Sequence, residues 1–455
     1  MISGLTTFNN KKCYFSLNKF QLILEEIENR DIQYVDDLEE VFGLKKVEIP
    51  QTLVGKDFDD REIIFNIAVG YKKSVKTYFL NLRSYIIFNS GETSYDAIQF
   101  NAEELNWFYD VRNAISCTTT PSTGEINLEA LPFIELEKSF TIASNKETIT
   151  GKFNISRNYS HANTTPLRLH TELTLHFEET NNYDRLDKLT NAFTKVFSFL
   201  TYRKNISINQ VILKKLNKDS GEYKKVGTFH LWNNTQSEEE NPKNIRERMI
   251  DIELIEGNLG DLFGKILDGK IYMRHVPENS VMKTEITPAR FLMATAGFEW
   301  QYDLYNSSTP NKVHKYSEQE KEIISFLEEK IISHQGRSKR YYKRIKSLVE
   351  RSNITLSDEI EESLTKYNDT IDIFLRSIFC LKKDDTFDKG EVSVRIARRR
   401  NDIAHGVITN DLDESIIQDL KVIELLYYVM VLDDIGVSKE KIQYAINKLF
   451  SFKIL

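Results

Sequence analysis

A short segment near the C-terminus carries the two side chains that RNA cleavage without a metal requires. Arg400 is followed directly by Asn401, and His405 lies five residues after Arg400. An imidazole titrates near neutral pH, so it can take a proton from a ribose 2′-hydroxyl or give one to a leaving 5′-oxygen. A guanidinium binds the scissile phosphate and offsets charge that develops in the transition state. The pair predicts cleavage that leaves 2′,3′-cyclic phosphate ends and needs no cofactor.

The expected secondary structure brings these residues together at a helix end. Residues 392–405 are predicted as a helix in which Asn401 and His405, four apart, share a face with small or apolar residues that can pack closely. Arg400 lies about 140° around an ideal helix from His405, a gap that its long side chain can bridge. Gly406 stands where a helix-ending glycine is expected, which places His405 at the C-terminus. The negative end of the helix dipole favours a protonated imidazole there.

The spacing of Arg and His is by itself a weak signal. The alternative is an Arg-rich, solvated helix with a capping histidine. Asn401 beside the arginine, Ala-His-Gly at the end of the segment and a late position in an all-α region strengthen the functional interpretation. Arg398 or Arg399 could take the place of Arg400, but only Arg400 is followed directly by Asn.

The segment Arg400-Asn401-Asp402-Ile403-Ala404-His405-Gly406 resembles the R-N-x-x-x-H signature of the HEPN superfamily. Members of that family are often metal-independent RNases of toxins and antiviral systems, and two protomers face each other across one cleft. The resemblance covers residues 286–455 and implies that Arg400 and His405 are the catalytic pair, with Asn401 at the polar position. Asp402 lies outside the shared pattern and could pair with Arg398 or Arg399.

The order of domains is similar to that of ApeA-like anti-phage proteins, in which a β-rich domain precedes a HEPN domain. Residues 150–155, a strand at 168–177 and a helix at 186–200 carry this likeness. It implies an endoribonuclease of abortive infection, with RNA as substrate, a homodimer or higher homo-oligomer as the working form, and a phage-encoded trigger. The alternative is a non-catalytic HEPN module for dimerisation or RNA binding in a defence or toxin–antitoxin system.

Other charged residues could support this chemistry. Glu299 lies in a largely apolar helix and could assist the Arg/His pair; the alternative is an ordinary amphipathic edge. Residues 337–346 form the most basic run and include two tyrosines. Lys and Arg attract phosphates and Tyr can stack on unpaired bases, although a solvated helix face is the more common reason for such a run. The RNA-binding candidates are Arg340, Lys343, Arg344, Arg398 and Arg399.

Composition limits the remaining possibilities. The chain has 455 residues and a formal net charge of -7, so contact with nucleic acid is expected to be local. Three widely spaced cysteines form no CxxC pair, and the histidines show no metal-ligand spacing, so no metal site is expected. No leader and no membrane-spanning segment are recognised. We therefore expect a cytoplasmic protein without membrane contact.

Hydrophobic periodicity predicts an α+β multidomain chain. Its parts are a β-rich sensing or regulatory domain with packed helices (1–240), a helical connector (241–285) and an all-α HEPN bundle (286–455). Strands are predicted at 61–69, 76–82, 84–89, 168–177, 208–216 and 223–232, and an exposed loop at 233–248. Helices are predicted at 16–29, 186–200, 259–267, 287–305, 317–333, 339–350, 357–381, 392–405, 413–432 and 438–452.

Overall fold

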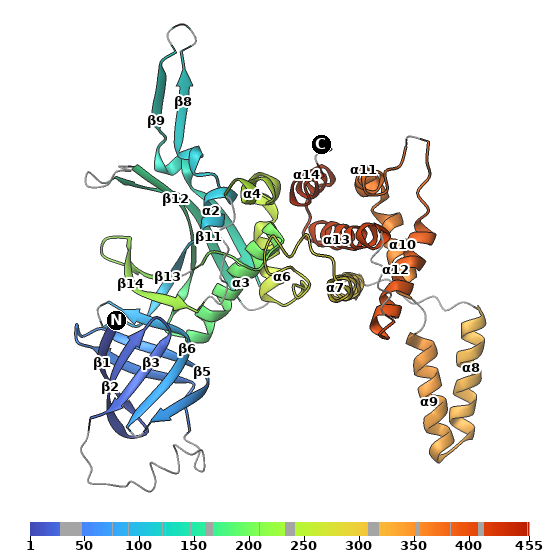
Figure 1. Cartoon of the computed structure of the whole chain (residues 1–455), viewed down its shortest axis with the longest axis horizontal. Helices are drawn as coiled ribbons and strands as arrows, with labels where there is room; N and C mark the ends of the chain where they lie inside the picture. Colours follow the sequence, from blue (N-terminus) through green and yellow to red (C-terminus); the bar gives the residue numbers. More distant parts are fainter. Residues whose placement is uncertain are drawn as a thin grey trace. The chain divides into compact units, whose positions relative to one another are not determined.

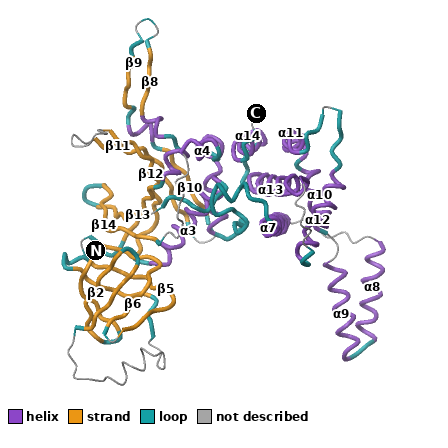
Figure 2. The backbone as a smooth tube through the Cα atoms, viewed as in Figure 1, coloured by secondary structure: helices purple, strands orange, loops and turns teal. Residues whose placement is uncertain are grey.

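The computed structural model describes residues 1–27, 48–74, 76–89, 91–120, 122, 124–144, 147–159, 167–208, 210–232, 242–307, 318–351, 355–382, 384–407, 414–452 and 454. Two compact units share this chain. The first contains residues 1–197 and 205–246, and the second contains residues 198–204 and 247–455. Strands dominate the first unit and helices the second (Figure 2), so the predicted α+β multidomain class is confirmed at this level.

Twelve of the described strands of the first unit form one large antiparallel sheet (Figure 1), in the order β10-β11-β12-β7-β13-β14-β6-β3-β2-β1-β4-β5. An additional pairing of β5 with β6 closes the last six strands into a ring. The strands are β1 (Ile2–Phe8), β2 (Lys11–Asn18), β3 (Gln21–Glu26), β4 (Thr52–Asp57), β5 (Glu62–Ser74), β6 (Thr77–Phe88), β7 (Tyr95–Asn101), β10 (Lys138–Ala143), β11 (Thr148–Tyr159), β12 (Leu167–Thr180), β13 (Gln210–Asn217) and β14 (Glu222–Leu231).

The helix predicted over residues 16–29 is wrong, because residues 16–26 belong to the hairpin of β2 and β3. Lys19 has a φ of 53° at the turn, a left-handed conformation that a helix does not contain. Leu22 and Leu24 are fully buried while the residue between them is only half-buried, which is the period of a strand. Pairing of β3 with β2 and β6 decides the structure where the apolar pattern alone is ambiguous.

The open part of the sheet is covered by helix α3 (Tyr183–Thr201), predicted at 186–200. Phe193 of α3 stacks on Phe100 of β7, with ring centroids 4.2 Å apart. The shorter elements of this unit are α2 (Glu103–Phe108), η1 (Val111–Ala114), the separate pair β8 (Ile115–Thr119) and β9 (Ile126–Ala130), η2 (Phe133–Leu136) and α4 (Pro242–Glu247). Helix α4 replaces part of the loop predicted at 233–248, of which residues 233–241 lie outside the described chain.

Helices are the only regular elements in the described part of the second unit, and α13 lies at its centre. Residues 422–432 of α13 are buried on every side, as expected for a helix with apolar residues all round. The helices are α5 (Ile252–Ile255), η3 (Glu256–Asn258), α6 (Leu259–Leu267), α7 (Pro288–Ser307), α8 (Glu318–Ser333), α9 (Gly336–Arg351), α10 (Leu356–Lys366), α11 (Asn368–Ile378), α12 (Lys389–Ala404), α13 (Glu414–Asp434) and α14 (Lys439–Leu449). None of these described helices combines the length and the apolar character needed to cross a bilayer.

The single helix predicted at 357–381 is instead the two helices α10 and α11. Thr355 caps α10 and forms a reciprocal pair of hydrogen bonds with Asp358, so the helix begins before the expected Ser357. Tyr367 marks the break, with its side chain largely buried. Its hydroxyl donates to Asp433 of α13 at 3.0 Å, a long-range contact that local periodicity does not reveal.

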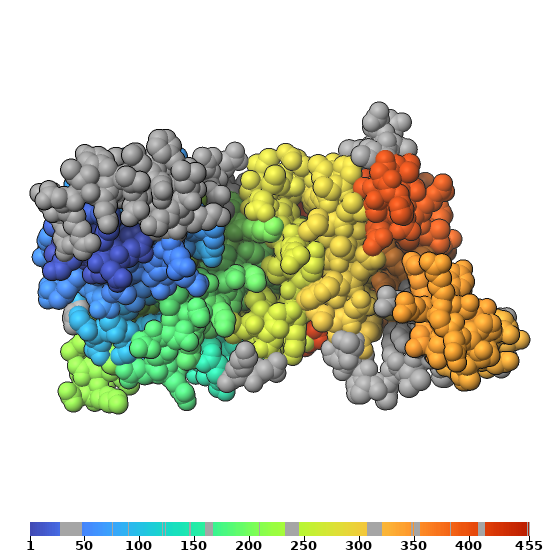
Figure 3. Space-filling model, turned by 90° about the horizontal axis from the view of Figure 1, so that it is seen from below, coloured from blue at the N-terminus to red at the C-terminus, as the bar shows by residue number. Residues whose placement is uncertain are grey.

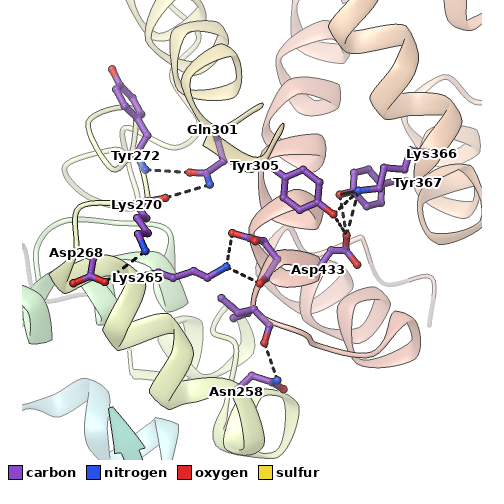
Figure 4. A network of polar contacts seen from close by, with 12 residues as sticks. Asn258, Lys265, Asp268, Lys270, Tyr272, Gln301, Tyr305, Lys366, Tyr367 and Asp433 are labelled. Carbon is purple, nitrogen blue, oxygen red and sulfur yellow. Dashed lines mark hydrogen bonds and ion pairs between the residues drawn. The ribbon is translucent and has the colours of Figure 1, made fainter. Parts of the chain in front are cut away.

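Polar contacts at the C-terminal end of α13 hold several helices together (Figure 4). Asp433 accepts hydrogen bonds from the hydroxyls of Tyr305 on α7, at 3.1 Å, and Tyr367. Lys265 of α6 pairs with Asp434 at 2.6 Å. Because α6 and α7 are both tied to α13, residues of the range predicted as a separate connector (241–285) belong partly to the helical unit. The same contacts keep α7 in a fixed position.

A buried histidine makes the stability of this unit dependent on pH. His275 packs against Tyr427, with ring centroids 4.2 Å apart, and neither ring nitrogen has a hydrogen-bond partner among the described residues. Burial, assisted by the charges of Lys204 and Arg290, lowers the pKa of His275 from 6.5 to about 3. Between about pH 3 and pH 6.5, His275 therefore binds a proton in the unfolded chain but not in the folded chain. This contribution to stability is complete above pH 6.5 and is lost as the pH falls.

Because only the unfolded chain protonates His275 in this range, we expect the free energy of unfolding to fall by about 2 kcal/mol from pH 7 to pH 5. His275→Phe keeps an aromatic ring in the pocket and removes the titrating group. Urea unfolding of both proteins at the two pH values measures the difference, since other titrating groups contribute equally to each. An identical loss of stability in the variant would show that His275 is not the cause.

Candidate active site

Helix α12 carries the segment singled out by its sequence. Asp388 caps its start by accepting a hydrogen bond from the Glu391 backbone N–H at 2.9 Å. The helix packs against α10 and α7 and buries Val392, Ser393 and Ile396. The face with small or apolar residues lies at the surface of the single chain: Val394 is 59% exposed, and Asn401 and Ala404 are exposed as well. The face that bears the candidate site is therefore open in the single chain.

The C-terminus of α12 has the predicted form. Gly406 has a φ of +77° and donates its backbone N–H to the Ile403 carbonyl at 3.1 Å. The N–H of Val407 reaches the Asp402 carbonyl at 2.9 Å, which completes a paired C-terminal capping motif. His405 is the last residue before this turn, at the negative end of the helix dipole. Its side chain is exposed, so a bound molecule can reach the imidazole.

Glu299 and Arg400 are brought together by the packing of α7 on α12. The Arg400 Nη2 atom donates to both Glu299 carboxylate oxygens, at 3.2 and 3.3 Å, and Nη1 donates to the Asn401 Oδ1 atom at 3.2 Å. The two charged side chains are 36% and 29% exposed, so solvent and solutes can reach the pair. The carboxylate fixes the guanidinium beside the amide. Three of the residues predicted for the site thus form one polar group.

A further carboxyl group near this pair was missed by sequence reasoning. Burial raises the pKa of Glu359 on α10 to about 8, with additional contributions from Asp303, Glu299 and other nearby carboxylates. At neutral pH this carboxyl is therefore largely protonated and can donate a hydrogen bond. Glu359 lies in the first turn of α10. Its burial depends on packing between distant segments, which leaves no local signal.

Arg399 has a structural role that differs from the predicted contact with RNA. Its guanidinium and that of Arg395 both bind Asp419 of α13, whose side chain is fully buried. Arg399 also donates to the Ser415 hydroxyl at 2.7 Å and is only 18% exposed. Asp419 and Ser415 thus occupy this guanidinium, and the binding of RNA by Arg399 stays a prediction. These ion pairs fasten α12 to α13.

Arg398 and Asp402 lie at the surface near the end of α12. Their side chains are 82% and 51% exposed, and the nearest charged atoms are 3.8 Å apart. The expected pairing of Asp402 with Arg398 is thus present, but an exposed pair of this kind contributes little to stability. Arg398 remains accessible to a polyanion, and Asp402 has no contact with Arg400.

The basic run of residues 337–346 lies on α9, which pairs with α8 in a helical hairpin. Atoms of this hairpin lie uncovered on the face drawn in Figure 3 (light orange). Tyr341 is 64% exposed beside three exposed cations, whereas Tyr342 packs against His334. These cations, which were predicted to bind RNA, are Arg340, Lys343 and Arg344. They are not part of the polar group around Arg400, so the hairpin is a separate basic surface.

Comparison with known proteins adds no further assignment. No family model matches the chain, and no curated protein and no solved structure matches it. Within the ranges that the structure describes, no group of three or more His, Cys, Asp or Glu side chains is placed to hold a metal ion.

Proposed function

We propose that the chain is a HEPN-type endoribonuclease that cleaves RNA without a metal, as an effector of bacterial anti-phage abortive infection. One observation carries the proposal. Arg400, Asn401 and His405 lie on the exposed C-terminal part of α12, where Glu299 orients the guanidinium and the helix end presents the imidazole. The proposed working form is a cytoplasmic homodimer or higher homo-oligomer that a phage-encoded trigger activates.

The proposed reaction is an internal transesterification of RNA. One His405 imidazole takes the proton from the 2′-hydroxyl, and the resulting oxygen attacks the adjacent phosphorus. The bond from phosphorus to the 5′-oxygen breaks, and a second, protonated imidazole gives its proton to that oxygen. Arg400 binds the non-bridging oxygens and offsets the charge that develops on them. The products are a 2′,3′-cyclic phosphate and a 5′-hydroxyl.

Two imidazoles are needed in this scheme, and one chain supplies only one at this position. The exposed face of α12 with Val394, Asn401 and Ala404 is the surface on which a second copy could bring its own site close. A two-fold axis places the same patch of both protomers in contact. The two copies of His405 and of Arg400 would then face each other across one cleft. The exposed cations of α9 and Arg398 are the proposed contacts to the remaining phosphates.

A non-catalytic module for dimerisation or RNA binding is the second candidate, and a specific observation favours it. The Arg400 guanidinium is already paired with Glu299, and further acidic residues of α7 and α10 lie near Glu359. A carboxylate competes with a phosphate for the same donors, and nearby negative charge weakens binding of a polyanion.

Incubation of the full-length chain with RNA in EDTA distinguishes the two candidates. We expect fragments with 2′,3′-cyclic phosphate ends, because neither proposed proton transfer uses a metal. The nature of the ends is read by resistance to ligation and by mass spectrometry. RNA that is bound but remains intact would favour the non-catalytic module. Cleavage only in the presence of a divalent metal would contradict both proposals for this site.

A further inference from the structure

The ribbon of β8 and β9 in the first unit has one apolar face that no described residue covers. Its register pairs Ile115 with Ala130, Cys117 with Leu128 and Thr119 with Ile126. Directly paired residues point to the same side of a sheet, so these six side chains form one face and the intervening polar residues form the other. Ile126 and Leu128 are 64% and 68% exposed. Figure 1 shows the ribbon extending away from the other strands of its unit.

The base of the ribbon is anchored, so its exposed part is a built feature of the fold. Ala114 and Leu136, which flank the two strands, are buried, and Tyr109 donates its hydroxyl to the Leu136 carbonyl at 3.0 Å. The backbone N–H of Leu131 also reaches the Ala114 carbonyl at 3.0 Å. Among the described strands, β8 and β9 pair only with each other. Each therefore keeps a free edge, and a two-stranded ribbon alone is marginally stable in water.

The charge of this segment restricts what can cover it. Residues 114–137 contain four glutamates and no lysine or arginine. All four are exposed; they are Glu125, Glu129, Glu135 and Glu137, of which Glu137 already forms an ion pair with Lys152 at 3.0 Å. RNA and anionic membranes carry the same sign of charge and are repelled. A partner with lysine or arginine beside apolar residues has the complementary charge.

The size of the face argues against a second copy as the occupant. Two strands of five residues cover a length of about 17 Å and a width near 10 Å, or roughly 170 Å². A stable dimer interface needs about 800 Å² from each partner. An added strand gains backbone hydrogen bonds along a free edge, so it can bind to a smaller face. Ile134, which is 86% exposed, continues the apolar surface beyond β9, whereas the ring of Phe133 packs against the Arg157 guanidinium, 4.2 Å from the ring centroid.

We infer that the β8–β9 ribbon is a docking site for an extended, basic segment of a partner protein, which adds as a third strand. Apolar residues at alternate positions of that segment lie on the same side as Cys117, Leu128 and Ile126 and pack beside them, and its basic residues lie near Glu129. This inference is independent of the proposed nuclease, because the ribbon belongs to the first unit and contains none of the candidate catalytic residues.

Two exposed cysteines allow the site to be tested in the full-length chain. Cys117 lies on the apolar face of the ribbon, whereas Cys380 lies in the second unit and serves as an internal control. The probe is a synthetic peptide of alternating valine and lysine, long enough to span about ten residues. We expect this peptide to slow alkylation of Cys117 about tenfold at saturation and to leave Cys380 unchanged. Mass spectrometry of the alkylated peptides measures both rates.

Matched probes and variants decide the result. Two control peptides have alternating valine and glutamate, or have all lysines in one block. We expect each to protect Cys117 from alkylation at least about tenfold more weakly than the alternating valine–lysine peptide does. Ile126→Thr with Leu128→Thr keeps strand propensity but should abolish protection, whereas Asn127→Thr, on the polar face, should not. The inference is overturned if the lysine peptide gives no protection, or if all peptides protect equally. Equal protection by RNA, by anionic vesicles or by higher concentrations of the chain itself would also overturn it.

Discussion

His405→Ala and Arg400→Ala are each expected to slow RNA cleavage at least about 10³-fold while the chain stays folded. The imidazole and guanidinium act on the reacting atoms, so each loss removes transition-state stabilisation. Both side chains reach the surface, and neither fills a core position. Single-turnover cleavage of labelled RNA with excess protein measures the rate, and thermal unfolding reports the fold.

Arg398→Ala is the matched control, because it removes a neighbouring arginine of the same helix that is 82% exposed. We expect it to weaken RNA binding, with a smaller dependence on salt, and to leave the cleavage rate at saturation nearly unchanged. If Arg398→Ala and Arg400→Ala had equal effects on that rate, the arginines would act only as general positive charge. Full activity of His405→Ala would remove the assignment of the site.

Local signals in the sequence predicted the features of the fold that depend on neighbouring residues. Gly406 predicted the end of α12 because a left-handed residue follows so many helices. The helix predicted at 287–305 begins as α7 does, and the Thr287 hydroxyl accepts a hydrogen bond from the Arg290 backbone N–H at 3.1 Å at this helix start. The alternation of residues 168–177 likewise predicted β12, which has one buried face. In each case the physical cause lies within a few residues.

Features that depend on distant segments were missed or left open. Leu22, Ile23 and Leu24 fit a helix as well as a strand, and only pairing with β2 and β6 selects the strand. Tyr367 breaks the helix predicted at 357–381 at a contact with α13. The sequence proposed Glu299 as a supporting residue but gave no partner atom for it. Its contact with Arg400 joins residues 101 positions apart, which a single sequence does not encode in any local pattern.

Asp419→Asn is expected to destabilise the helical unit by about 2–4 kcal/mol. The Asp419 carboxylate is fully buried and is the shared partner of Arg395 and Arg399. An amide of the same shape cannot neutralise two guanidiniums, and its NH₂ group points a donor at donors. Urea unfolding at neutral pH measures the loss, while the unchanged volume of the side chain excludes a cavity as its cause.

Asp402→Asn is the matched control for this change, since it neutralises a carboxylate on α12 whose partner is 3.8 Å away at the surface. Its effect on stability should stay within about 0.5 kcal/mol. Through Arg395 and Arg399, Asp419 fastens the helix that bears the candidate catalytic side chains. Asp419→Asn should therefore also lower RNA cleavage, and a stabilising osmolyte should restore part of it. If Asp419→Asn abolished cleavage without lowering stability, Asp419 would have to act directly on the RNA. A fully buried side chain cannot do so, and this result would contradict the structural role of Asp419.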